Sequence, residues 1–336
     1  MRQLAMRGVN YDTGTAYIGG AMSRVVWTLD DVRRDMRAIA ADLGCTHVCV
    51  YGTDTDRLLA AAEIALQAGL KVSVQRRVVD EGPETMRKAV TDCARRLAVL
   101  GATDRLILNL GCEASLFTTG FIPGRNVLMR MKALGVLWPV LLPFITIRLR
   151  KLLREIADDV RAVFGGPLTY SSGTWESIDW APFDFVGVDL YRDRDNEKTY
   201  LSDLRGYLRH RKPVLITEFG CCSFEGAEWL GGGGWLVVDH TIDPPEVKPG
   251  HTRSEEVQAR HVIEMLDLFA AEGVHGAFVF TFVESGSRHA SDPRHDLDMA
   301  CYGLVKVLSG EDADSITWEP KQAFGAVASR FLAGPD

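Results

Sequence analysis

Two glutamates stand directly after runs of large aliphatic residues. Glu113 follows Leu106 to Cys112, and Glu218 follows Val214 to Thr217. A carboxylate beside a buried strand is costly without a partner, so two such positions call for a reason. One reason is structural, because either glutamate can pair with one of the two arginines at 76–77. The other is catalytic, because two facing carboxylates can serve as nucleophile and proton donor, or as acid and base.

Short apolar β-type runs alternate along the chain with amphipathic helical segments, which indicates parallel βα units. Eight strands are predicted, at Arg7 to Tyr11, Thr46 to Tyr51, Lys71 to Gln75, Arg105 to Leu110, Leu168 to Ser171, Phe185 to Tyr191, Pro213 to Thr217 and Gly276 to Phe282. Helices are predicted at Leu29 to Leu43, Asp56 to Ala68, Glu84 to Leu100, Leu149 to Phe164, Tyr200 to His210 and Ser254 to Glu272.

This order of elements favours a single (β/α)8 TIM barrel of the α/β class over residues 1–336. We expect extended loops after strands 4, 7 and 8, and a hydrophobic insertion around 121–150. The first predicted strand is not followed by Gly-x-Gly-x-x-Gly, so a dinucleotide-binding sheet loses its main support. No cofactor and no metal is predicted.

Chemistry on such a barrel takes place at the carboxyl ends of the strands and in the loops that follow them. Glu113 and Glu218 are the predicted catalytic residues. The predicted substrate contacts are polar or aromatic residues at the same end, namely Asn10, Tyr11, Asp12, Tyr51, Arg76, Cys112, Trp175, Tyr191, Trp235, Phe282, Glu284 and His289.

The pair of glutamates resembles the catalytic pair of the retaining glycoside hydrolases of clan A, which are (β/α)8 barrels. Ile216-Thr217-Glu218-Phe219-Gly220 is similar to that superfamily's nucleophile strand, and Val186 to Tyr191 looks like the strand whose tyrosine binds the nucleophile. The resemblance implies that Glu113 is the acid/base at strand 4 and Glu218 the nucleophile at strand 7. A weaker resemblance is to bacterial barrel proteins labelled abortive-infection proteins.

Two positions depart from that pattern. Cys112 stands where the superfamily has an asparagine that binds the sugar 2-hydroxyl, and the eighth strand carries Phe280 and Phe282 but no tryptophan. The resemblance implies a retaining glycosidase that acts on a small-molecule glycoside. The alternatives are a non-hydrolytic acid/base enzyme, for glycosyl transfer or cyclisation, and an inactive barrel that only binds a ligand.

Two loops add polar groups near the predicted mouth. The loop of about Cys221 to Thr252 contains Trp235 and four consecutive glycines, and we interpret it as a mobile lid. The loop after strand 8 offers possible metal ligands at His289, Asp292, His295 and Asp296. Because no metal-binding spacing is present, we favour a salt-bridged network with polar substrate contacts over a metal site.

The composition excludes some partners. The net charge of −7 and a pI near 5.7 disfavour nucleic acid as a partner.

The cysteines bear on cellular location. Seven cysteines, an odd number that includes the adjacent Cys221 and Cys222, indicate thiols in a reducing compartment. Met1 to Arg7 lacks the apolar stretch of a secretory signal, so we expect a cytoplasmic location. The oligomeric state is left open.

Ala133 to Ile147 is an apolar stretch of 15 residues flanked by basic residues. It is shorter than the ~20 residues that span a membrane, and Pro139 and Pro143 are expected to break its helix. We therefore predict no membrane span, but a buried or half-buried insertion, with weak contact to a membrane interface as the alternative.

Overall fold

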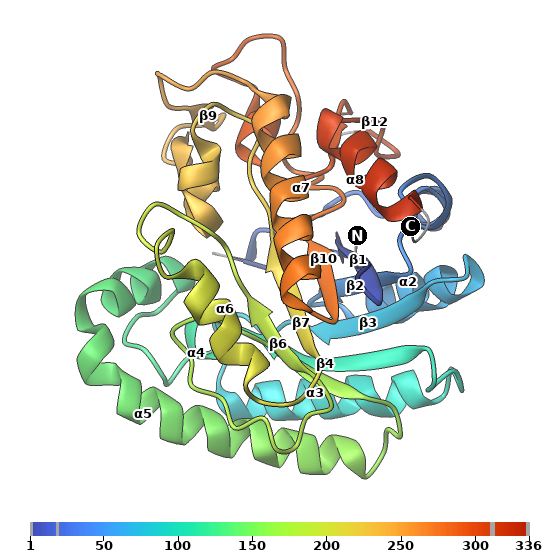
Figure 1. The fold of residues 1–336 in the computed structure, drawn as a ribbon, viewed down its shortest axis with the longest axis vertical. Helices are drawn as coiled ribbons and strands as arrows, with labels where there is room; N and C mark the ends of the chain where they lie inside the picture. Colours follow the sequence, from blue (N-terminus) through green and yellow to red (C-terminus); the bar gives the residue numbers. More distant parts are fainter. Residues whose placement is uncertain (1–2, 18–19, 310–312, 334–336) are drawn as a thin grey trace.

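The computed structural model describes residues 3–17, 20–309 and 313–333. Eight parallel strands close into a barrel in the order β1-β10-β7-β6-β5-β4-β3-β2, which confirms the predicted TIM barrel (Figure 1). The strands are β1 (Met6–Asp12), β2 (His47–Gly52), β3 (Lys71–Arg76), β4 (Leu106–Cys112), β5 (Leu168–Ser172), β6 (Val186–Asp189), β7 (Val214–Phe219) and β10 (Gly276–Val279). Each lies within a predicted strand or overlaps it, although the last ends at Val279 instead of Phe282.

Helices surround the barrel. They are α1 (Leu29–Arg37), α2 (Thr55–Gln67), α3 (Pro83–Ala98), α4 (Ala114–Phe117), α5 (Val127–Arg161), α6 (Tyr200–Leu208), α7 (Glu255–Glu272) and α8 (Gln322–Leu332). The predicted helix over Leu29 to Leu43 is α1 followed by a π-helical turn over Ala38–Asp42. Residues 173–185, all of which the structure describes, join β5 to β6 without a helix.

Local sequence explains where these helices begin and end. The side chains of Thr28, Asp54 and Ser254 accept hydrogen bonds from backbone N–H groups of the first turns of α1, α2 and α7. Pro83 begins α3, where its missing N–H costs nothing. Gly273, at φ 81°, ends α7 in the left-handed conformation that glycine adopts without strain.

The barrel interior changes from apolar to polar along its axis. Cys49, Leu215 and Phe278 form an apolar layer at one level, and Gly8 leaves room for the Phe278 ring, which a Cβ would meet at 2.3 Å. Nearer the carboxyl ends, Asn109 and Gln75 both donate to the Ser171 hydroxyl. The polar layer brings hydrogen-bonding groups to the end of the barrel where the glutamates lie.

The prediction for the apolar stretch 133–147 was wrong in two respects. Pro139 and Pro143 do not break the helix, because α5 runs without interruption through both. Gly135, Pro139 and Pro143 are all exposed, so the carbonyls that lose a helical partner lie on an open side where water can bind them. The stretch is also mostly exposed, and the predicted helix over Leu149 to Phe164 is the second half of α5.

By length and composition alone, α5 is sufficient to cross a membrane. An 18-residue window within it has a mean hydropathy of 1.5, and 11% of that window is buried in the protein. Figure 1 shows α5 at the outer edge of the molecule, beside α3.

The long loop after β7 is packed instead of open. It forms the 3-10 helices Ala227–Trp229 and Gly231–Val237 and a hairpin of β8 (Val238–Asp239) and β9 (Glu246–Val247). Its apolar residues share a second small core with Cys222 and Tyr302. Gly234 lies against both of these residues, so the packing argues against a flexible segment at the four glycines.

Candidate active site

The two glutamates occupy the same end of the barrel. Glu113 immediately follows β4, and Glu218 lies in β7, with β6 and β5 between them in the barrel. Gly111 has φ 153°, and the β4–β5 register shifts between Asn109 and Cys112. Such a bulge re-aims the end of a strand, which here carries Cys112 and Glu113.

Glu113 has an unusual backbone conformation. Its φ is 43° and its ψ 45°, the left-handed region that a residue with a Cβ seldom adopts. Its N–H donates to the Ser171 carbonyl at 2.8 Å, and its own carbonyl accepts from Leu116 and Phe117 in the first turn of α4. Left-handed geometry at a non-glycine residue costs about 1 kcal/mol and is found preferentially at functional sites.

Glu218 is held by two donors. The Arg77 guanidinium donates to Oε1 at 2.5 Å, and the Tyr191 hydroxyl donates to Oε2 at 3.3 Å. Arg77 lies 4.2 Å over the Tyr51 ring and also donates to the Tyr17 hydroxyl. The carboxylate is therefore fixed in orientation, and its negative charge faces a cation that is itself buried.

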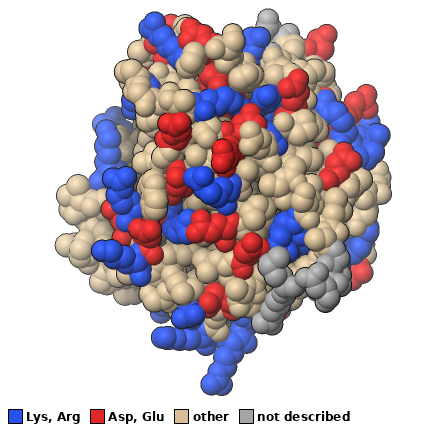
Figure 2. Space-filling model, turned by 45° about the horizontal axis from the view of Figure 1, so that its top comes forward, with Lys and Arg blue, Asp and Glu red and all other residues tan. Residues whose placement is uncertain are grey.

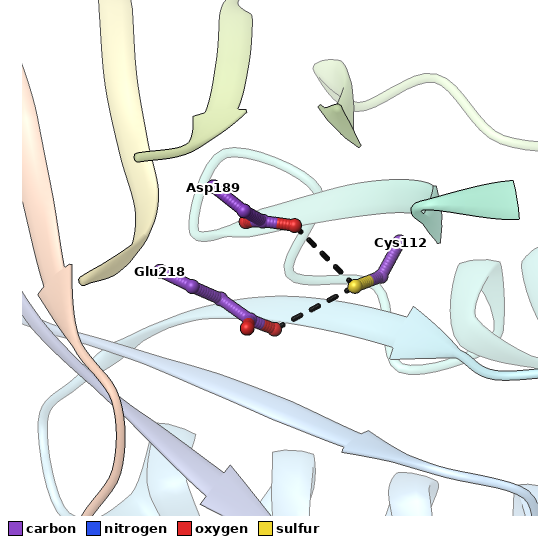
Figure 3. A group of neighbouring side chains, drawn as sticks. All are labelled: Cys112, Asp189 and Glu218. Atoms are coloured by element: carbon purple, nitrogen blue, oxygen red, sulfur yellow. Dashed lines mark hydrogen bonds between the residues drawn. The ribbon is translucent and has the colours of Figure 1, made fainter. Parts of the chain in front are cut away.

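A thiol separates two carboxyl groups at the centre of the site. Cys112 Sγ lies 3.4 Å from Asp189 Oδ2 and 3.6 Å from Glu218 Oε1, as Figure 3 shows. One S–H can donate to only one of them at a time. The other oxygen of Asp189 accepts from the Thr217 hydroxyl at 2.7 Å.

The electrostatics of the acids differ. Burial raises the pKa of Glu113 well above its usual range, and the nearby charges of Glu218 and Glu176 raise it further. Burial, followed by the charges of Glu218 and Glu113, raises the pKa of Asp189 in the same way. Both shifts favour the protonated form of the carboxyl group, and a protonated carboxyl can donate a proton.

Several predicted contacts do meet around Glu218. Cys112, Tyr51 and Tyr191 all contact Glu218 or its partner Arg77. Trp175, in the loop after β5, donates its indole N–H to Ser115, which lies two residues beyond Glu113. These side chains stay candidates for substrate contact.

Other predicted contacts already form hydrogen bonds or packing contacts within the protein. The Asn10 amide donates to the backbone carbonyls of Thr217 and Phe278, and Asp12 accepts from the N–H of Gly14. Glu284 accepts from the N–H of Tyr302, and burial raises its pKa to about 7. Trp235 packs in the second core beside His240.

Two predicted contacts point away from the mouth. The Tyr11 hydroxyl donates to Asp35 of α1 outside the barrel, and Phe282 packs against Trp318 and Phe324, so neither lines the site. Arg76 donates to Thr55 and lines a hollow beside β3 and β4, whereas the cation that binds Glu218 is its neighbour Arg77.

Arg77, Asp189 and Tyr17 were not among the predicted substrate contacts, although one of the two arginines at 76–77 was expected as a possible partner of a glutamate. A signal for Arg77 was present, because Ser73, Gln75 and Arg77 are alternate polar residues, and alternate residues of a strand face the same side. All three side chains are buried. Asp189 is likewise a charged residue at the end of an apolar strand, whereas nothing in the local sequence marks Tyr17.

Among the residues that the structure describes, two groups of side chains have the residue types of a metal site. Cys112, Asp189 and Glu218 form one, and His289, Asp296 and Asp298 form the other. Neither fits a cation well, because Arg77 already pairs with the first group and Arg253 pairs with both aspartates of the second. His289 binds Asp296 at 2.9 Å, so this loop forms a salt-bridged network of the kind that we favoured.

A small hollow adjoins the site beside β3 and β4. Arg77, Cys112 and Phe117 are among its lining residues. Glu218 itself is 8% exposed. Arg77 covers one side of it, and the Tyr17 and Phe117 rings, whose centroids are 6.2 Å apart, lie on the far side of Arg77. The acid cluster is thus largely shielded from water.

No protein-family model matches the sequence, and no curated protein matches it either. Among solved structures, a GH113 β-1,4-mannanase has a TM-score of 0.62 at 14% identity, covering 99% of this chain and 100% of that one. The GH113 β-mannanase of Alicyclobacillus acidocaldarius in complex with ManMIm has a TM-score of 0.57 at 18% identity, covering 98% and 97%. A β-glucosidase has a TM-score of 0.58 at 13% identity, covering 98% of each chain. The chain thus has the barrel fold of several glycosidases.

Proposed function

We propose that the protein is a retaining O-glycosidase in which Glu218 is the nucleophile and Glu113 the general acid and base. The observation that carries this proposal is the contrast between the two carboxyl groups. Glu218 is held by Arg77 and Tyr191, whereas burial and the charge of Glu218 favour a protonated Glu113. A fixed carboxylate and a protonated acid at one barrel end are the two groups that retention requires.

The reaction proceeds in two displacements. Glu218 attacks the anomeric carbon, the bond to the leaving oxygen breaks, and Glu113 gives its proton to that oxygen. Glu113, now a carboxylate, then takes a proton from water, whose oxygen displaces Glu218 from the sugar. The two inversions leave the anomeric configuration unchanged and return both glutamates to their starting states.

We propose a β-linked glycoside as the substrate. This choice rests on the fold shared with proteins described as β-mannanases and a β-glucosidase, so β-mannosides and β-glucosides are the first compounds to test. Phe280 stacks on Tyr51 with ring centroids 5.9 Å apart, which supplies an aromatic surface near Glu218 in the absence of a strand-8 tryptophan.

The test is a panel of aryl β-glycosides with wild type, Glu218→Ala, Glu113→Ala and the control Glu225→Ala, whose side chain is exposed. Loss of the nucleophile should reduce kcat roughly 10⁴-fold on every substrate. Loss of the acid should slow alkyl glycosides strongly but spare the first step with a dinitrophenyl leaving group, which needs no proton. Activity that survives in Glu218→Ala would refute the proposal.

Glycosyl transfer is the second candidate. The low exposure of Glu218 supports it, because a site that excludes water favours an organic acceptor over hydrolysis. Product analysis in the presence of a free sugar or alcohol distinguishes the two reactions, since transfer yields a new glycoside and hydrolysis yields the free sugar.

A further inference from the structure

Helix α5 carries an exposed apolar stripe that the proposed reaction does not use. Val136, Val140 and Ile147 are 80%, 78% and 71% exposed, and Phe144 is 44% exposed. Successive members are three or four residues apart, so they lie on one face of the helix. We call these four residues the apolar stripe.

The other side of α5 is fastened to the protein. Met131, Leu134 and Leu141 pack against the main core, and Leu149 and Leu153 are buried. The helix therefore cannot rotate to hide the apolar stripe. It also cannot be surrounded by lipid unless these contacts break, which disfavours a membrane-spanning position for α5 in this fold.

Charge in the sequence segment that contains the apolar stripe has a single sign, and the nearest acid along the chain, Glu155, lies 3.9 Å from Lys151. The 41 residues from Ala114 to Arg154 contain seven arginines and lysines and no aspartate or glutamate, although the whole chain carries −7. Lys132 precedes the apolar stripe, and Arg150 and Lys151 follow it; all three are exposed. By contrast, basic and acidic side chains are interspersed over the upper and central part of the face in Figure 2.

Helical geometry places these charges beside the apolar stripe. At about 100° per residue, Lys132 and Lys151 lie within roughly 60° of Val136 around the helix axis. They are separated along the axis by about 28 Å. Basic groups thus flank both ends of the exposed apolar surface on the same side of the helix.

We propose that α5 attaches the protein to the surface of an anionic lipid bilayer. The apolar stripe enters the boundary between headgroups and acyl chains, while Lys132, Arg150 and Lys151 contact anionic headgroups. Two copies of the chain meeting at this face would bring like charges together, which disfavours self-association there. This attachment is independent of the proposed glycosidase activity.

The test is flotation of the full chain with phosphatidylcholine vesicles that contain or lack about 30% phosphatidylserine. Binding should require phosphatidylserine and weaken as salt rises, because the attraction is screened. Val140→Glu/Ile147→Glu should reduce binding about tenfold or more. The matched control is Val99→Glu, which changes a valine that is 84% exposed at the end of α3 and should not alter binding.

Three results would overturn the proposal. One is no binding to phosphatidylserine vesicles at low salt, and another is equal binding by Val99→Glu and Val140→Glu/Ile147→Glu. The third is a concentration-dependent dimer, in sedimentation velocity, that Val140→Glu/Ile147→Glu abolishes, which would assign the apolar stripe to a second copy. Lys132→Glu/Lys151→Glu separates the electrostatic contribution to binding from the hydrophobic one. It leaves the apolar stripe intact, so it should weaken vesicle binding and reduce the salt dependence of that binding.

Discussion

Two of the buried ionic clusters in the described part of the chain are built differently. In the loop after β10, Asp298 forms ion pairs with Lys321 at 3.0 Å and with Arg253 at 2.9 Å, and Arg253 also pairs with Asp296. In the barrel mouth, Glu113, Asp189 and Glu218 gather, and among the described residues their single ion pair is with Arg77.

The difference separates a structural cluster from a reactive one. In the first cluster, each aspartate is paired with a cation, and these pairs fix the loop. Excess acid in a buried place shifts pKa values, as at Glu113 and Asp189, and such unbalanced acids are typical of sites that move protons. The comparison predicts that mutations in the first cluster affect stability and that mutations in the second affect turnover.

The largest effect is expected for Lys321→Met in the first cluster. Both Lys321 and Asp298 side chains are fully buried, and removing one partner of a buried pair costs about 3–5 kcal/mol. Urea unfolding measures the loss. Lys151→Met is the control, because Lys151 lies 3.9 Å from Glu155 and is 76% exposed. A loss below about 1 kcal/mol for Lys321→Met would contradict the structural role of this cluster.

Arg77→Gln should act on catalysis more than on stability. Removing the cation from Glu218 should lower kcat/KM by about 10²–10³-fold, while the unfolding free energy changes less than in Lys321→Met because the Arg77–Glu218 pair is less completely buried than the Lys321–Asp298 pair. Arg57→Gln is the control, since Arg57 donates to the backbone carbonyls of Thr13 and Arg24 and not to the acids. Equal losses of activity in the two variants would contradict the proposed role of Arg77 in catalysis.

The smallest effect is a shift in a pH profile. Glu113 must be protonated to act as the acid, so activity should fall as pH rises through its raised pKa. The charge of Glu176 contributes to that raised pKa. In Glu176→Gln the pKa of Glu113 should fall, and the basic limb of kcat/KM should move to lower pH by less than about one unit. A shift to higher pH, or the same shift in Glu225→Gln, would contradict the assignment of Glu113 as the general acid.

The barrel itself was predictable because its signal is repeated along the chain. Each strand is a short apolar run, and each helix shows three- and four-residue spacing, so errors of a few residues at the ends do not change the topology. The positions of Glu113 and Glu218 follow from the same pattern, because parallel strands bring their carboxyl ends together.

The directions of individual side chains were harder to predict. Alternation distinguishes Arg77 from Arg76, but it was not applied at that strand end. It also cannot place Phe282, because β10 ends at Val279 and the chain then leaves the barrel. Similarly, the exposure of the α5 residues depends on what packs against the helix, which hydropathy alone does not report.

The sequence by itself determined the order of strands and helices and the strands that carry the two glutamates, because local periodicity encodes both. Only the tertiary structure decided that Arg77, and not Arg76, binds Glu218, that Cys112 lies between two carboxyl groups, and that one side of α5 stays uncovered. Those features arise where segments distant in the chain meet. The contact energies there depend on distance and burial, and no local pattern records either.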